Sequence, residues 1–193
     1  MGRRGCTAAA SYSRHALTDM KFLVVAVGHR MPGWIATGFE EYAQRMPRTA
    51  RMELKEIKPA TRSGGSAASV QQWLAVEAER IRNALPRQCL RVVLDEKGKL
   101  CSTRDLARRI ESWQQEGRDI AFVIGGADGT EPGLQQQADL LLSLSPLTLP
   151  HGLCRVLLAE QIYRAISLTA GHPYHRELQA GLGIEDRSPN PQS

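Results

Sequence analysis

The chain has 193 residues, of which 42% are hydrophobic and 23% are charged, and its formal net charge is +5 at pH 7. This length and composition are typical of one globular domain, and they exclude a disordered or fibrous protein. The sequence has no run of about 18 apolar residues, so it predicts no membrane span. The positive charge favours an anionic partner such as nucleic acid, although a solvated basic surface explains it equally well.

The four cysteines, Cys6, Cys89, Cys101 and Cys154, show no close spacing. They indicate neither a zinc site nor a disulfide framework. We therefore expect free thiols in a reducing cytoplasm.

The two ends of the chain differ from the rest in composition. Residues 1–19 contain several arginines, no acid before Asp19 and no apolar core, which excludes a secretory signal. An organellar transit peptide is one interpretation, and a start assigned upstream of Met20 is the simpler one. Residues 178–193 end in a segment whose composition is typical of disorder. We expect both extensions to be dispensable and the functional domain to cover residues 20–177.

In chain order, the first half of this domain alternates predicted strands and helices. The apolar run 21–27 predicts a buried strand, and apolar spacings of three and four predict a helix over 34–46. Alternating apolar and charged residues predict a strand over 51–58. A loop rich in Gly and Ser over 59–69 leads to a helix over 70–85.

The alternation continues after residue 90. A strand over 90–94 is followed by a turn over 95–100. Ser102 and Asp105 have the spacing of a capping box, which predicts the start of a helix that ends at Gly117. The apolar run 120–124 predicts the fourth strand.

The last part of the domain is predicted to hold a short helix, a strand, an apolar loop and a long helix. The short helix passes through Leu134 and Ala138, and the strand covers 140–142. The loop covers 143–149, and the final helix runs from Pro150 to about Thr169, with Gly171 as its cap. Strands that alternate with helices predict an α/β protein with a mostly parallel sheet and helices on both faces.

Ligands of such sheets bind at the carboxyl ends of the strands. Leu94 ends a predicted strand, and the loops 125–129 and 143–149 each follow one, so we group them as one candidate site. The loop 125–129 contains Gly125, Gly126 and Gly129, which suit a tight turn or the binding of an anion by backbone amides. It lacks the spacing of a P-loop or of a dinucleotide-binding motif.

The loop 144–149 places Ser145 and Thr148 among leucines and Pro146. Apolar walls with exposed backbone groups suit an adenine, and a plain buried connection is the alternative interpretation. Glu160 and Arg164, four residues apart, are expected to pair on the surface of the final helix.

Three histidines in the last quarter of the chain are candidate metal ligands. His151, His172 and His175 lack supporting cysteines or carboxylates, so no metal site is predicted. The segment HPYHRE at 172–177 instead offers aromatic stacking and phosphate contacts to an unstacked RNA base, with an ordinary helix C-terminus as the alternative.

Several longer segments go beyond generic patterns. IGGADG, SLSPLTLPH and RVLLAEQIYRAISLTAGHPYHRE follow one another in that order. They come after KFLVVAVGHRMPGW at the start of the domain and VVLDEKGK in its middle. Together they resemble the large-subunit ribosomal RNA methyltransferase H family over residues 20–177. The family chain typically ends near HRE, so residues 178–193 depart from its pattern.

This resemblance implies a SPOUT methyltransferase domain with a C-terminal trefoil knot, and a homodimer. It implies S-adenosylmethionine as the cofactor and methylation of pseudouridine N3 in large-subunit ribosomal RNA within the assembled ribosome. It places the cofactor against residues that lie at or just after the carboxyl ends of predicted strands: Leu94, Gly125, Gly126, Leu144, Ser145, Pro146, Leu147, Thr148 and Leu149. We assign substrate positioning to Tyr174, His175 and Arg176, and expect a cytoplasmic protein that needs no metal and no membrane.

Two other functions remain open at this point. The same fold could methylate another nucleotide of ribosomal or transfer RNA, which mapping of the methylated position distinguishes. Alternatively, the chain could bind the cofactor and the ribosome without turnover.

Overall fold

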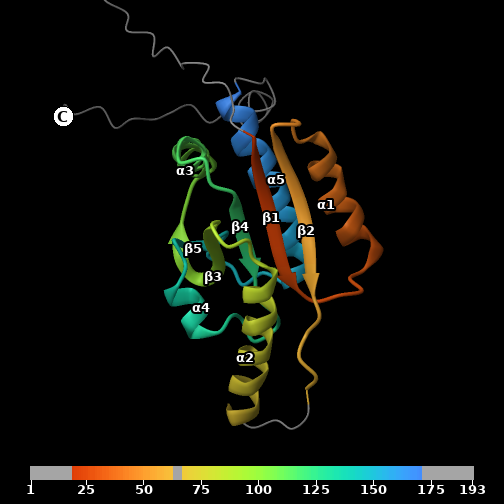
Figure 1. Ribbon diagram of the computed structural model, residues 1–193. Coiled ribbons are helices and arrows are strands. Elements are labelled where there is room, and N and C mark those ends of the chain that lie inside the picture. The colour runs from red at the N-terminus through yellow and green to blue at the C-terminus, as the bar shows by residue number, and fades with distance from the viewer. Residues whose placement is uncertain (1–18, 63–66, 171–193) are drawn as a thin grey trace, which may run out of the picture.

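The computed structural model describes residues 19–62 and 67–170. Five strands form one sheet: β1 (Met20–Val27), β2 (Ala50–Ile57), β3 (Leu90–Leu100), β4 (Ile120–Ile124) and β5 (Leu140–Ser143). Five helices connect and cover them: α1 (Gly33–Arg45), α2 (Ala67–Ala84), α3 (Thr103–Gln115), α4 (Pro132–Gln136) and α5 (His151–Thr169). Figure 1 shows their arrangement. The predicted order of elements is confirmed, with most boundaries within a few residues.

All strand pairs in the sheet are parallel, in the order β2-β1-β4-β3-β5. The central strand β4 is buried along its whole length, as expected for a strand covered on both faces. Because the strands are parallel, every strand-to-helix connection leaves the sheet at the same edge. The predicted α/β class is therefore confirmed, and the carboxyl edge collects five loops.

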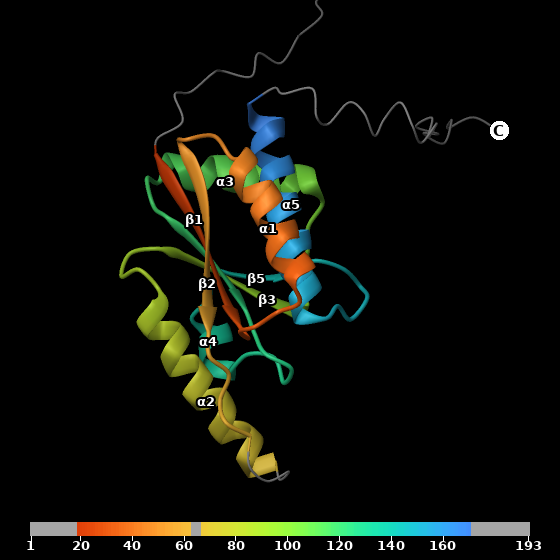
Figure 2. The ribbon, with the colours of Figure 1, turned by 90° about the vertical axis from the view of Figure 1, so that its right-hand side faces the viewer.

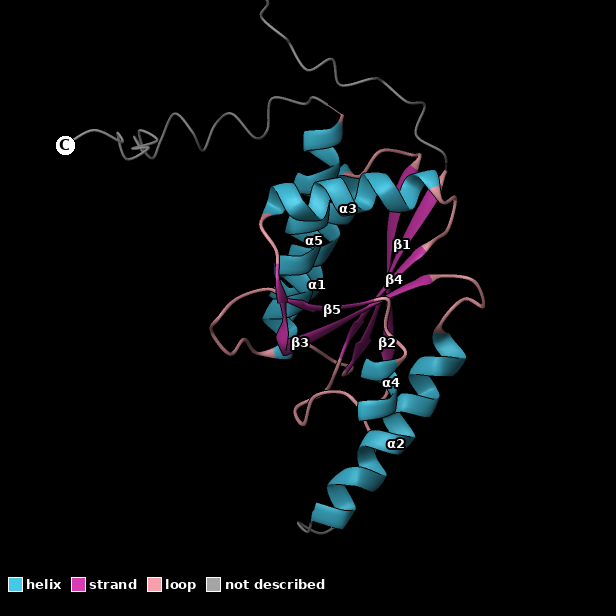
Figure 3. Cartoon of the chain, turned by 90° about the vertical axis from the view of Figure 1, so that its left-hand side faces the viewer, coloured by secondary structure: helices cyan, strands magenta, loops and turns pink. Residues whose placement is uncertain are grey.

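Alternate side chains of the strands enter two separate cores. Phe22 and Val24 of β1 belong to the core that α1, α3 and α5 share with one face of the sheet. Val25 and Val27 belong to the smaller core that lies under α2 and α4. Figures 2 and 3 show α2 on the side of the sheet opposite α1 and α5. The period of two along the strand thus decides which helices each side chain contacts.

The start of α3 confirms the predicted capping box. The Ser102 hydroxyl accepts from the Asp105 amide at 3.1 Å, and the Asp105 carboxylate accepts from the Ser102 amide at 3.3 Å. The hydrogen bond from the Ser102 side chain is the main cause that lowers the pKa of Asp105 below its ordinary value. The local sequence therefore caps this helix end, and the hydroxyl of Thr103, its first residue, adds a tertiary hydrogen bond to the Gln161 side chain at 2.7 Å.

The predicted turn over residues 95–100 is wrong, because these residues continue β3. Leu94 and Lys99 both pair with Leu142, so the four residues between them bulge out of the ladder before the strand resumes. The chain then comes so close to β5 that Gly98 has no room for a side chain. A Cβ there would lie 2.6 Å from the Leu142 carbonyl carbon.

Replacing Gly98 by Ala should lower the free energy of unfolding by about 1–3 kcal/mol, because the added methyl meets backbone rather than a movable side chain. Urea denaturation of both proteins measures the change. Gly33→Ala is the matched control, since nothing lies within 4 Å of a Cβ at that position. Equal unfolding midpoints for wild type and Gly98→Ala would contradict the close approach of β3 to β5.

Candidate functional site at the carboxyl edge of the sheet

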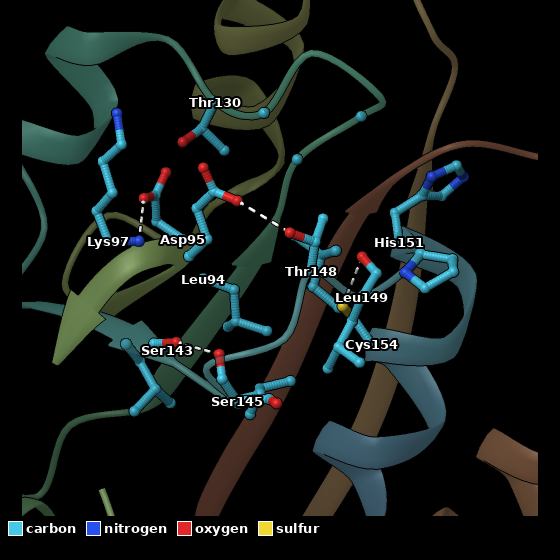
Figure 4. A pocket seen from close by; sticks show the side chains of 18 of the residues that line it. Leu94, Asp95, Lys97, Thr130, Ser143, Ser145, Thr148, Leu149, His151 and Cys154 are labelled. Atoms are coloured by element: carbon cyan, nitrogen blue, oxygen red, sulfur yellow. Dashed lines mark hydrogen bonds between the residues drawn. The ribbon is translucent and has the colours of Figure 1, made fainter. Parts of the chain in front are cut away.

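A cavity of about 1010 Å³ opens at the carboxyl edge of the sheet. Its walls come from the end of β3 and its bulge, the β4–α4 loop, β5 with the loop that follows it, and the first turn of α5. Figure 4 shows these segments converging on one space. The cavity therefore lies where the ends of the predicted strands grouped the candidate site.

Eight of the nine predicted cofactor residues line this cavity: Leu94, Gly125, Gly126, Leu144, Ser145, Leu147, Thr148 and Leu149. Pro146 is the exception, since it is exposed and is not among the lining residues. Tyr174, His175 and Arg176 lie outside the described residues, as do His172 and Gly171.

The glycine loop after β4 is a tight turn that also walls the cavity. The Gly129 amide donates to the Gly126 carbonyl at 3.1 Å, and the two residues form an antiparallel bridge. A Cβ at Gly125 would lie 2.3 Å from the Gly129 carbonyl oxygen. Gly129 itself has a φ of +83°, a backbone conformation that residues with a side chain rarely adopt. The loop can only take this path because it has glycine at these positions.

Serine side chains hold the loop between β5 and α5. The buried Ser143 hydroxyl donates to the Ser145 carbonyl at 2.9 Å, and the Ser145 hydroxyl accepts from the Leu147 amide at 3.0 Å. These local bonds leave leucine side chains of the loop on the cavity wall. The wall is therefore apolar in its side chains and ordered through its serines.

Carboxylates line the cavity of this otherwise basic chain. Three acids, Asp95, Glu96 and Asp128, face it with a single lysine, Lys97. Asp95 accepts from the Gln135 amide group at 2.9 Å, and Glu96 accepts from the hydroxyl of Thr148, which belongs to the loop after β5, at 3.4 Å. Sequence reasoning missed Asp95, Glu96 and Lys97 because it treated 95–100 as a turn. Their position directly after Leu94 was the signal that could have found them.

A buried arginine ties the site to the other half of the sheet. The Arg155 side chain on α5 is 1% exposed and pairs with Glu56 at the end of β2 at 2.7 Å. It also donates to the carbonyls of Val27 at 3.1 Å and Gly28 at 2.9 Å, where β1 ends. Arg155 therefore fixes the start of α5, and with it the end of the cavity loop, against β1 and β2.

His151 is the first residue of α5 and lines the cavity beside Cys154 (Figure 4). Partial burial lowers the pKa of the imidazole below its ordinary value of 6.5, and the nearby Arg155 and Arg62 guanidinium groups lower it further. Burial raises the pKa of the Cys154 thiol. At neutral pH the imidazole is therefore neutral and the thiol stays protonated.

Glu160 and Arg164 pair as their spacing predicts, but not on the surface. Their side chains are 14% and 19% exposed, so the pair packs into the protein. Neither residue lines the cavity. In the described part of the chain no cluster of three potential metal ligands occurs, and no helix there is long and apolar enough to cross a membrane.

A parallel sheet with a glycine-walled cavity at its carboxyl edge is typical of α/β proteins that bind a nucleotide-like cofactor. Residues 20–175 match the sequence model of a family described as "Predicted SPOUT methyltransferase". The class is therefore that of the SPOUT methyltransferases, which implies the C-terminal trefoil knot that the resemblance predicted.

Curated relatives narrow the class to one family. The chain is 61% identical to Ribosomal RNA large subunit methyltransferase H of Nitrosospira multiformis over 157 residues, which are 81% of this chain and 99% of that protein. It is 58% and 59% identical, with the same coverage, to proteins of the same name from Burkholderia multivorans and Burkholderia thailandensis. The chain belongs to the ribosomal RNA large subunit methyltransferase H family.

Proposed function

We propose that this protein transfers a methyl group from S-adenosylmethionine to N3 of a pseudouridine in large-subunit ribosomal RNA, within the assembled ribosome. The observation that carries the proposal is the acidic, leucine-walled cavity at the carboxyl edge of the sheet in a chain of this family. The relatives' names state a ribosomal RNA substrate, and the finer target follows from the family resemblance.

The residues present fit S-adenosylmethionine. Leu94, Leu142 and Leu144 offer apolar surface for an adenine, and the backbone of the β5–α5 loop offers polar groups beside it. Asp95 and Glu96 make the cavity favourable for a ligand that carries sulfonium and ammonium charges, whereas Asp128 is paired with Arg62 at 2.7 Å. When bound, the cofactor supplies a methyl group on an electrophilic sulfonium.

The chain's own residues have the tasks of binding and alignment. The cofactor residues proposed are the cavity-lining ones predicted from the sequence, with Pro146 as a residue that shapes the loop. Tyr174, His175 and Arg176 are proposed to position the target base. Alignment of two reactants accounts for a large part of catalysis when the electrophile is already reactive, so no metal is required.

The proposed partners follow from charge and family. A net charge of +5 on a chain whose cofactor cavity is acidic leaves the excess of positive charge elsewhere on the molecule, which suits an RNA partner. A homodimer and a cytoplasmic location are the further parts of this proposal. Because each ribosome holds one target, we infer that a dimer engages one site at a time.

The function is tested by transfer of labelled methyl from S-adenosylmethionine to ribosomes of a strain that lacks this gene. We expect label on one large-subunit pseudouridine, with more transfer to whole ribosomes than to separated subunits or free ribosomal RNA. Label confined to transfer RNA would support a different target. Cofactor binding without any transfer would support a binding module.

Replacing Glu96 by Gln tests whether the negative charge of the cavity contributes to cofactor binding. Removing this carboxylate should weaken S-adenosylmethionine binding about fivefold, because opposite unit charges about 4 Å apart attract each other by ~1 kcal/mol in water. S-adenosylhomocysteine, which lacks the sulfonium charge, should be weakened less. Calorimetry measures both, and Glu40→Gln on the exposed surface of α1 is the matched control. An equal loss for the two ligands would contradict a role for this charge.

The proposed role of the tail, residues 172–177, in positioning the RNA is tested by replacing His175 and Arg176 by Ala. We expect methyl transfer to fall at least about tenfold, because a misplaced substrate loses the benefit of alignment. The cofactor's dissociation constant should stay within about twofold of wild type if the tail contacts only the RNA, since a factor of ten corresponds to 1.4 kcal/mol. Unchanged transfer would remove both residues from the mechanism.

A further inference from the structure

His151 is placed between the cavity and the end of β1. It follows the β5–α5 loop directly, lines the cavity, and its Nε2 lies 3.4 Å from the point where a Cβ on Gly28 would be. In the part of the chain that the structure describes, no hydrogen bond to the imidazole ring is found. The ring nitrogens are therefore free of partners from residues 19–62 and 67–170.

The charges around this ring keep it neutral. Arg155 lies one turn further along α5, and Arg62 approaches from the loop after β2. Each guanidinium is already paired with a carboxylate at 2.7 Å, Arg155 with Glu56 and Arg62 with Asp128. Because Glu56 and Asp128 are paired with these arginines, neither carboxylate is available to stabilise an imidazolium at His151. His29 and Arg30, the charged or titratable residues of the β1–α1 loop, are exposed.

Other cavity residues are less suited to accept a proton. Asp95 already accepts hydrogen bonds from the Lys97 amide and the Gln135 side chain, both at 2.9 Å. Asp128 is held by Arg62, and the Cys154 thiol is protonated because burial raises its pKa. Among the described residues that line the cavity, His151 combines a neutral titratable ring with ring nitrogens that have no partner.

We propose that His151 is the proton acceptor of the methyl transfer, and this inference rests on the proposed function. The base nitrogen N3 gives its proton to a ring nitrogen of His151 and forms a bond to the methyl carbon with the electron pair that this releases. The bond between that carbon and sulfur breaks, and its electrons stay on sulfur, which becomes a neutral thioether. The positive charge passes from sulfonium to imidazolium. The two neighbouring arginines disfavour imidazolium, so the proton is passed on to water and the His151 ring becomes neutral again.

The test compares His151→Gln with wild type in single-turnover methyl transfer to ribosomes at saturating S-adenosylmethionine. Glutamine keeps a polar side chain but accepts no proton, so we expect the rate to fall about a hundredfold or more. The wild-type rate should fall on acidification with a midpoint below pH 6.5, as the imidazole becomes protonated, and this acid limb should be absent from the variant. His29→Gln, an exposed histidine on the neighbouring loop, is the matched control and should keep both the rate and the limb.

Two further measurements separate proton transfer from structure. The affinity of His151→Gln for S-adenosylmethionine, measured by calorimetry, should stay within about threefold of wild type, because a loss confined to the rate marks an interaction made in the transition state. Added imidazole should restore part of the rate to His151→Ala, because it can replace the missing base. Circular dichroism melts of both variants establish that they are folded.

Each outcome has a defined meaning. A His151→Gln enzyme with the wild-type rate and acid limb overturns the inference, and so does a loss of cofactor affinity equal to the loss of rate. Absence of methyl transfer to RNA by the wild-type protein overturns the proposed function and this inference with it. Transfer by wild type, loss in His151→Gln and rescue by imidazole support both.

Discussion

The buried Arg155 guanidinium is the interaction on which the geometry of the site depends. It joins three parts of the chain that are far apart in sequence: the end of β1, the end of β2 and the first turns of α5. Hydrogen bonds to charged groups contribute about 1.5–3 kcal/mol each, and they offset the cost of removing the charge from water. Since the cavity loop ends where α5 begins, this contact fixes one wall of the cavity to the sheet.

The parallel sheet explains why one cavity collects so many functional groups. Each strand delivers its following loop to the same edge, so β3, β4 and β5 each contribute a wall. Two of these walls depend on glycine at points of close backbone approach, Gly98 at β5 and Gly125 at its own turn. The cavity is thus shaped by backbone contacts, which leaves the side chains free for charge and apolar surface.

Charge divides the molecule into two kinds of surface. The chain as a whole is basic, whereas its cavity holds three acids against one lysine. The proposed cofactor is cationic and the proposed RNA substrate is polyanionic, so they need opposite fields, and this distribution supplies both within one small domain. His151 lies near two arginines that are each paired with a carboxylate, which suits its proposed role as a ring that accepts and then releases a proton.

The sequence by itself determined the order of strands and helices, because runs such as 120–124 and caps such as Ser102 with Asp105 act over a few neighbouring residues. It also determined most of the cavity, since parallel strands bring their carboxyl ends together wherever they fold. Only the tertiary structure decided that residues 95–98 bulge before β3 resumes, that Pro146 is exposed and does not line the cavity, and that Arg155 is buried. These features depend on contacts between segments about 40 to 130 residues apart, such as Gly98 with Leu142 and Arg155 with Gly28. Local propensities carry no information about such contacts, because the partner that creates each one lies in another part of the chain.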